Sequence, residues 1–412
     1  MKNVMIKNKI NNLNLSSTLK INEISKQLEK EGKDIIKFGF GQSPFQVPEQ
    51  IVEELKKNAH QKSYLPIQGL EALREVIAKY ESKKKNKNFT LDQIIVGPGS
   101  KELMFLLHIS FDGEIILPCP SWVSYKPQSI IADNKFHWIE TTAENNWYPN
   151  AESIQNLVLK NKEKKYLMIL NSPNNPSGQV CKNLNEISEI IKKYKIIVLS
   201  DEIYSELTFN KNNESIANYC PDNVIISNGL SKWCGAGGWR LGYFVIPEKL
   251  DQLKNSMKVL ASETFSAVSA PIQYAAIAAF NKDHFDYVSK SKIILKAIGE
   301  YVYNNLKSNN VIMNKPMGGF YLMPEFLNKK FNSSEEMCTD LLNKKGVAIL
   351  PGSDFGFLKD RMISRLSYTD FDGKYFMSKI NLDTKIDDDL IKKLAPKIVE
   401  GTKRLKDWVG KA

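Results

Sequence analysis

The chain has 412 residues, more than one ordinary hydrophobic core accommodates, and its 42% hydrophobic and 25% charged residues are typical of a soluble globular protein. It contains no run of about 18 apolar residues, so we expect neither a transmembrane helix nor a membrane partner. The polar N-terminus lacks the apolar core of a signal peptide, so we expect a cytoplasmic protein. The five cysteines are scattered and have no metal-ligand spacing, which predicts reduced thiols and no metal site.

The net charge of +11 comes almost entirely from lysine, since only five residues are arginine. The lysines are spread along the sequence and form no basic helix, so we do not expect nucleic acid as a partner. Arginine is preferred to lysine where a planar, bidentate contact with carboxylate or phosphate is needed. Arg240 and Arg365 both lie inside motifs, and we therefore expect each of them to bind an anion.

The N-terminal part is predicted to contain a helix over residues 16–32, followed by an extended segment over residues 34–40. Beyond it, apolar runs of strand length alternate with helical patterns such as residues 101–111 and 184–194. The predicted strands are residues 93–96, 114–117, 136–140, 166–170, 196–199, 224–227 and 242–246. Strands separated by helices indicate an α/β fold with a mainly parallel seven-stranded sheet between helices.

The C-terminal third has a different pattern. An alanine-rich stretch predicts a buried helix over residues 270–280, and a second helix is expected over residues 286–308. The remaining expected elements are strand-like pieces at 319–323, 347–350 and 364–367 and a final helix over 386–409. We therefore predict a large domain over residues 45–285, and a small α+β domain in which residues 1–44 and 286–412 pack together.

Lys232 lies in the most informative segment, residues 228–243, which reads Asn-Gly-Leu-Ser-Lys-Trp-Cys-Gly-Ala-Gly-Gly-Trp-Arg-Leu-Gly-Tyr. A lysine amine is a strong nucleophile only when burial or neighbouring cations lower its pKa. The apolar, glycine-rich sequence and Arg240, eight residues later, supply both conditions. Such a lysine can bond to an aldehyde cofactor. The segment resembles the cofactor-lysine signature of class I/II aminotransferases, fold-type I enzymes that use pyridoxal phosphate (PLP).

The resemblance implies which residues hold the PLP ring. Asp201 ends a predicted strand, where open α/β sheets bind ligands, and with Tyr204 it matches the family's Asp-x-x-Tyr motif. Asp201 is expected to pair with the ring nitrogen, and Tyr204 to hydrogen-bond the 3′-oxygen. The turn over residues 171–178 is similar to the family's Asn-Pro-Thr-Gly turn, with serine replacing threonine. It implies that Asn175 contacts the 3′-oxygen and the substrate carboxylate.

The phosphate of PLP is expected at the start of a helix. Residues 96–101, Val-Gly-Pro-Gly-Ser-Lys, end a predicted strand and open a helix, and helix N-termini bind anions through their free N–H groups. The resemblance implies that Ser100 and the Lys101 amide bind the phosphate and that Arg240 adds a cation.

Two further phosphate contacts follow from the resemblance. Tyr64 begins a Tyr-x-x-x-x-Gly-x-x-x-Leu-Arg segment like that of the family, which implies that it reaches the phosphate from the partner subunit of a homodimer with shared active sites. Three residues before Lys232 the family often has serine. This chain has Gly229 there, so Ser231 is expected to take its place.

The remaining matches concern the substrate. Trp122 lies in a Pro-x-Trp-x-x-Tyr loop similar to the family's, and is expected to stack on the ring and contact the substrate. Arg365, in an Arg-x-Ser strand, is expected to bind the α-carboxylate, and Gly41 to offer its backbone to the same group. After Gly41 this chain reads Gln-Ser-Pro-Phe, whereas the family more often reads Glu-Pro-Asp-Phe, a departure that bears on specificity.

The resemblance extends from about residue 15 to about residue 405, and the N-terminal part looks like the Iγ branch of aspartate aminotransferases. In some Iγ enzymes the position of Lys101 meets a distal carboxylate, which somewhat favours aspartate or glutamate as substrate. A lysine there could equally face solvent, so aromatic donors and alanine stay open. Residues 369–383 form a segment longer than the family's and do not match it.

The implied reaction is ping-pong transfer of an amino group between an L-amino acid and a 2-oxo acid. Lys232, freed from the cofactor, removes the α-proton and returns it. A PLP-dependent lyase acting on a single amino acid would share every cofactor residue and is the alternative. A non-catalytic regulator on the same fold is less favoured, because such regulators carry a DNA-binding domain before the matching region.

Overall fold

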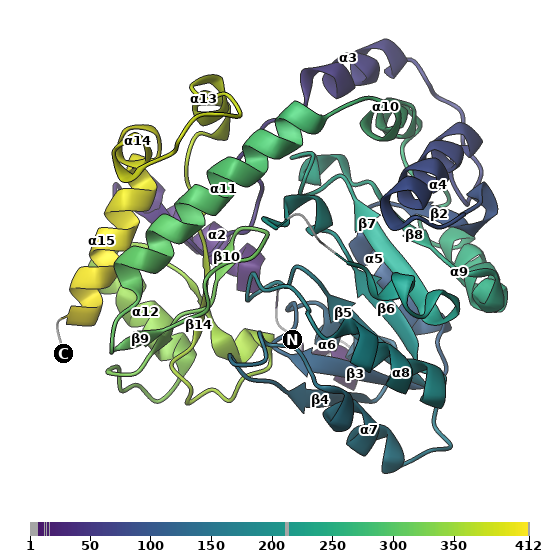
Figure 1. Ribbon diagram of the computed structural model, residues 1–412, viewed down its shortest axis with the longest axis horizontal. Helices are drawn as coiled ribbons and strands as arrows, with labels where there is room; N and C mark the ends of the chain where they lie inside the picture. Colours follow the sequence, from purple (N-terminus) through teal and green to yellow (C-terminus); the bar gives the residue numbers. More distant parts are fainter. Residues whose placement is uncertain (1–6, 12, 14, 16, 211–213, 411–412) are drawn as a thin grey trace, which may run out of the picture.

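The computed structural model describes residues 7–11, 13, 15, 17–210 and 214–410. Its centre is a seven-stranded sheet in the order β2-β8-β7-β6-β5-β3-β4 (Figure 1). β8 runs antiparallel to both neighbours and the other pairs are parallel, which confirms the predicted α/β fold. The strands are β2 (Ile94–Gly97), β3 (Glu114–Cys119), β4 (Phe136–Glu140), β5 (Tyr166–Asn171), β6 (Ile197–Asp201), β7 (Val224–Gly229) and β8 (Gly242–Val245).

Both faces of the sheet are covered by helices. Successive strand residues belong to opposite faces, so that Met168 lies in one apolar cluster and Leu167 and Ile169 lie in the other. The helices on one face are α5 (Ser100–Ser110), α6 (Tyr125–Ile131) and α9 (Asp251–Ser262). Those on the other face are α4 (Glu71–Lys85), α7 (Ala151–Leu159), α8 (Leu184–Tyr194) and α10 (Ala270–Asn281), with α3 (Glu49–Asn58) packed on α10.

Segments from both ends of the chain pack together beside this sheet (Figure 1). β1 (Ile36–Lys37) pairs in parallel with β12 (Val347–Ala348), some 300 residues later. β14 (Ser364–Ser367) lies between β10 (Tyr321–Leu322) and β13 (Leu350–Pro351), and β9 (Val311–Ile312) pairs with β11 (Glu325–Phe326). The helices of this part are α2 (Ser17–Lys30), α11 (Phe285–Leu306), α12 (Ser334–Lys345) and α13 (Gly373–Ser378).

The prediction of one final helix over residues 386–409 is wrong. The segment forms α14 (Asp388–Leu394) and α15 (Pro396–Gly410), separated at Ala395, whose backbone is not helical (φ −135°, ψ 55°). Proline disfavours the helical conformation of the residue before it and has no N–H to donate, so Pro396 begins a new helix instead of continuing the old one.

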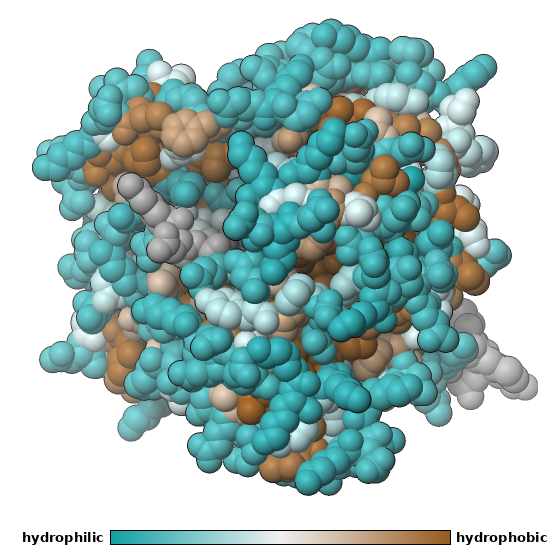
Figure 2. Space-filling model, turned by 45° about the vertical axis from the view of Figure 1, so that its right-hand side comes forward, coloured by the Kyte–Doolittle hydropathy of each residue, from teal (hydrophilic) through white to brown (hydrophobic). Residues whose placement is uncertain are grey.

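The surface agrees with the composition. In Figure 2 the visible face is mostly hydrophilic and is interrupted by small groups of hydrophobic side chains. Among the helices of the described residues, none is both long enough and apolar enough to cross a membrane.

Candidate active site

The carboxyl ends of the parallel strands open into a cavity of about 410 Å³, as expected for ligand sites of open α/β sheets. Asp201 ends β6, Asn171 ends β5, and the loop after β7 carries Lys232. The cavity brings together eleven of the twelve predicted site residues: Gly41, Ser100, Lys101, Trp122, Asn175, Asp201, Tyr204, Ser231, Lys232, Arg240 and Arg365. The twelfth, Tyr64, is 93% exposed and does not line the described cavity of its own chain.

Lys232 is the half-buried amine at the centre of this cavity. Its Nζ donates to the carbonyl oxygen of Gly41 at 2.9 Å and lies 5.5 Å from the ring centre of Tyr204. Burial lowers the pKa of Lys232 to about 8, and the positive charge of Arg365 acts in the same direction. A substantial fraction of the amine is therefore neutral near pH 8 and can act as a nucleophile or base.

Asp201 is a buried carboxylate with two protein donors. Its Oδ2 accepts from the Tyr125 hydroxyl at 2.6 Å, and its Oδ1 accepts from the Ile203 amide at 3.3 Å. Burial raises the pKa of Asp201 to about 6, although these hydrogen bonds oppose the shift. At neutral pH the group is mainly ionised and suited to hold a cationic ring nitrogen.

Arg365 projects from β14 and is 1% exposed. Its Nη1 donates to Asn175 Oδ1 at 3.1 Å, and its Nη2 donates to the Gly39 carbonyl at 2.6 Å. The guanidinium lies 4.7 Å from the ring centre of Tyr321, while Nε has no hydrogen-bond partner among the described residues. A buried arginine with an unused donor matches the needs of a carboxylate ligand.

The first turn of α5 also lines the cavity. Its N-cap is Gly99 (φ 88°), and no described side chain caps the helix, so its first N–H groups are available to an anion. Arg240 lies beside this turn, and its Nη2 donates to the Pro98 carbonyl at 3.3 Å. A Cβ at position 99 would lie 2.2 Å from Arg240 Nη2, so only glycine permits this close approach. Helix N–H groups beside a guanidinium make a cradle that can hold a phosphate.

Lys101 and Trp122 form one wall of the cavity. Lys101 Nζ lies 5.2 Å from the ring centre of Trp122, close enough for a cation–π contact. Burial lowers the pKa of Lys101, and the charge of Arg240 adds to the effect. Lys101 itself lines the cavity.

The structure explains the departure at Gly229. This residue pairs with Gly242 across β7 and β8, and a Cβ on it would lie 2.7 Å from the Leu241 carbonyl oxygen. A serine therefore does not fit here without a shift of the strands. Ser231 lines the cavity two residues later.

Several residues of the site were not predicted. Tyr125 belongs to the Trp-x-x-Tyr motif and could have been identified from it. Asn171 starts the predicted turn, donates to the Asp201 carbonyl at 2.8 Å and accepts from the Asn175 amide at 2.7 Å. Tyr321, whose hydroxyl lies 2.9 Å from that of Tyr204, sits in a two-residue strand and carries no motif.

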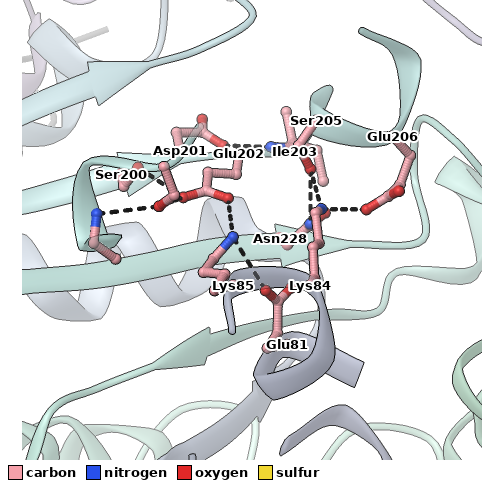
Figure 3. A network of polar contacts seen from close by, with 12 residues as sticks. Glu81, Lys84, Lys85, Ser200, Asp201, Glu202, Ile203, Ser205, Glu206 and Asn228 are labelled. Atoms are coloured by element: carbon pink, nitrogen blue, oxygen red, sulfur yellow. Dashed lines mark hydrogen bonds and ion pairs between the residues drawn. The ribbon is translucent and has the colours of Figure 1, made fainter. Parts of the chain in front are cut away.

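A buried ionic network behind the cavity also escaped prediction (Figure 3). Lys85 Nζ, at the end of α4, lies 2.6 Å from Glu202 Oε2 and 3.3 Å from Glu81 Oε2. Burial opposes the charge of Lys85, but Glu202 and Glu81 raise its pKa above the ordinary value. Because Glu202 follows Asp201 directly, the network fixes α4 to the loop that carries the site. Only the i,i+4 spacing of Glu81 and Lys85 is visible in the sequence.

The donor set as a whole fits a flat, phosphorylated aldehyde cofactor such as PLP. The cradle at α5 matches its phosphate, the buried carboxylate of Asp201 its ring nitrogen, and Lys232 its aldehyde. The unused donor of Arg365 remains for a substrate carboxylate.

Comparisons with known proteins agree with this geometry. Residues 33–378 match the family described as aminotransferase class I and II. An aspartate aminotransferase of Bacillus sp. (strain YM-2) is 32% identical over 368 residues, covering 85% of this chain and 92% of that protein. The solved aspartate aminotransferase of Thermotoga maritima has a TM-score of 0.83 at 28% identity, covering 98% of this chain and 100% of that one. An alanine aminotransferase from Pyrococcus furiosus has a TM-score of 0.86 at 26% identity, covering 99% and 100%. The chain therefore belongs to the aminotransferase class I and II family.

Proposed function

We propose that this aminotransferase moves the amino group of an acidic L-amino acid to a 2-oxo acid by a ping-pong mechanism. The observation that carries the proposal is the position of Lys232, which shares one cavity with Asp201 and Arg365 and has its pKa lowered to about 8. An amine placed there can reach both a cofactor held by Asp201 and a substrate held by Arg365.

The family depends on PLP, which supplies, when bound, a ring that withdraws electrons from the bond to the substrate's α-hydrogen. We assign the ring nitrogen to Asp201, the 3′-oxygen to Tyr204 and Asn175, and the ring face to Trp122. We assign the phosphate to the N-terminus of α5, with Ser100, the Lys101 amide, Ser231 and Arg240.

The protein's own groups then bind and orient the substrate and move its proton. Arg365 binds the α-carboxylate through its planar fork, and Asn175 and the backbone at Gly41 border the same place. Lys232 Nζ acts as the general base that takes the proton from Cα, because a pKa near 8 suits proton transfer at neutral pH.

An acidic side chain on the substrate is favoured by the charge of the cavity. Lys101 and Arg240 line it in addition to Arg365, so a second carboxylate would find a cation. Relatives named aspartate aminotransferase support the same preference. The similar structure named alanine aminotransferase makes alanine the main alternative substrate.

We also propose a homodimer in which Tyr64 completes the phosphate site of the partner, because Tyr64 lies in a segment that resembles the family's and its side chain is 93% exposed and does not line the described cavity of its own chain. The proposed large domain spans residues 45–285, and residues 1–44 and 286–412 form the small one.

A cytoplasmic location is supported by the five cysteine thiols, which are all buried and free.

The direct test is to replace Lys232 by alanine in the PLP-loaded protein. Without this amine the cofactor cannot bond to the protein, so the visible absorbance of the lysine-bonded cofactor should disappear. Because the same amine moves the proton, turnover should fall by at least about 1,000-fold. Lys56→Ala, at an exposed lysine near the end of α3, is the control and should change neither. Turnover retained in Lys232→Ala would refute the assignment.

A half-reaction distinguishes the transaminase from a lyase. With aspartate or glutamate as the only substrate, the loaded protein should release about one 2-oxo acid per site and then stop, because no acceptor restores the cofactor. Continued release of ammonia from a single amino acid would contradict the proposal. If alanine reacts better than aspartate or glutamate, the acidic preference is wrong.

A further inference from the structure

Residues 37–46, here called the strap, lead from β1 towards α3, line the cavity at residues 40–42 and contact both of its central cations. The carbonyl oxygen of Gly39 accepts from Arg365 Nη2 at 2.6 Å, and that of Gly41 accepts from Lys232 Nζ at 2.9 Å. A Cβ on Gly41 would lie 2.0 Å from the Tyr321 hydroxyl, so the strap is pressed directly against the site. Its position therefore decides how both cations meet a substrate.

The alternate carbonyl groups of the strap are held by the segment that follows Arg365. Phe38 O accepts from the Ser367 amide at 2.7 Å, and Phe40 O accepts from the Thr369 hydroxyl at 3.1 Å. Arg365, Ser367 and Thr369 therefore each donate a hydrogen bond to a carbonyl oxygen of the strap. One run of chain thus supplies both the arginine of the site and the groups that hold the strap beside it.

Asp370 adds a charged contact at the start of the strap. Its Oδ2 accepts from the Lys37 amide at 2.8 Å, and its Oδ1 lies 3.8 Å from Lys397 Nζ. The Asp370 side chain is 16% exposed, which makes this charge-assisted hydrogen bond more costly to lose than a fully solvated one.

The far end of the strap is fixed by packing. A Cβ on Gly373 would lie 2.4 Å from the Pro44 carbonyl oxygen, so α13 begins in direct contact with the strap. The Phe371 ring lies 6.0 Å from that of Phe45, edge to face. Residues 369–373 thus contact both ends of the strap.

We propose that Thr369 and Asp370 are positioning residues that hold the strap in register with Arg365 and Lys232 and so set the affinity for the substrate's carboxylate. The inference rests on the proposed function, because it takes Arg365 as the carboxylate site. Neither residue lines the described cavity, so both act through the strap.

The test compares Thr369→Val, which removes the hydroxyl at nearly constant volume, with Thr369→Ser, which keeps it. Maleate, a dicarboxylate without an amino group, serves as a probe of carboxylate binding. Losing one hydrogen bond to the strap should weaken maleate binding and raise KM for the amino donor by about five-fold, with kcat changed less than about two-fold. Thr369→Ser should retain native values. Thr402→Val is the control, because it removes a threonine hydroxyl whose hydrogen bond, to the Ile398 carbonyl, stays within α15 and involves no strap residue.

A second readout needs neither cofactor nor turnover. Hydrogen–deuterium exchange of the strap amides should be faster in Thr369→Val and in Asp370→Asn, which weakens the acceptor of the Lys37 amide, and unchanged in Thr402→Val. Native exchange and native maleate affinity in both strap variants would overturn the proposal. A fall in kcat at unchanged KM would also overturn it, since it would place the effect on the chemical step.

The two proposals fail in different ways. If the native protein lacks transaminase activity, the proposed function fails, but exchange of the strap amides still reports whether Thr369 and Asp370 hold the strap. If activity is present and the variants behave as native, the strap proposal alone fails. A variant with a lowered melting temperature is judged at a temperature where it is fully folded.

Discussion

At the scale of single residues, Lys232 shows how much of the chemistry is set by burial. The pKa of about 8 means that the amine loses its proton as pH rises through that value, well below the ordinary lysine value of 10.5. The opposing influence is Asp201, whose carboxylate stabilises the charged amine, and Arg365 and Arg240 add to the effect of burial. The pKa of Lys232 is therefore set by burial and the two arginines, which lower it, against Asp201, which raises it.

This competition predicts the pH dependence of cofactor capture. Because only the neutral amine attacks an aldehyde, the rate at which cofactor-free protein binds PLP should rise with pH and level off above about 8. Stopped-flow absorbance between pH 6 and pH 11 measures it. In Asp201→Asn, which removes the opposing charge, the midpoint should move to lower pH. A native midpoint near 10.5 would show that the cavity does not perturb the amine.

At the scale of secondary-structure elements, the pairing of β7 with β8 leaves no room for a side chain at Gly229. Gly229→Ser should therefore destabilise the protein by about 1–3 kcal/mol in urea unfolding and should not tighten cofactor binding, although serine is common there in the family. Ser231→Ala is the comparison and should weaken cofactor binding at near-native stability. Tighter binding in Gly229→Ser at native stability would contradict the steric argument.

Among the strands and helices, the sequence predicted those with long apolar runs and missed the short ones. The strands of the central sheet were found within a few residues because both faces are buried, which gives continuous apolar runs. The strands near the C-terminus are mostly two residues long and have no period to detect; the expected piece at 347–350 proved to be β12 and β13, which pair with different partners. Pro396 was the signal that should have ended the last predicted helix.

The sequence also predicted some residues of the site and not others. Arg365 and Arg240 were identifiable because arginine is rare in this chain, and Asp201 because it ends a buried strand. Tyr321 and the strap contact of Thr369 were not identifiable, because they depend on which distant segments meet: Tyr321 and Tyr204 are 117 residues apart, and Thr369 and Phe40 are 329 residues apart. The assigned roles of the cavity residues remain predictions, to be tested by substituting each residue in turn.

At the scale of the whole molecule, the proposed shared site can be tested with mixed dimers. Lys232→Ala and Tyr64→Ala subunits should each be weakly active alone. In a hybrid dimer, the site that keeps its own Lys232 receives Tyr64 from the Lys232→Ala partner, so one site of the two is native. Unfolding and refolding the two variants together, with turnover measured against the unmixed samples, checks this. No gain over the unmixed samples would exclude a contribution of Tyr64 across subunits.

In the role proposed for it, Arg365 recognises a carboxylate by its planar shape and charge. Its Nε, which has no hydrogen-bond partner among the described residues, does not distinguish between the chemical groups that a carboxylate carries. We therefore expect acetate, formate and other small anions of the medium to occupy this position and compete with amino acids. Apparent affinities would then depend on the buffer chosen. Inside a cell, the total pool of organic acids would slow the enzyme most where its own substrates are scarce, because plentiful substrate displaces a competing anion.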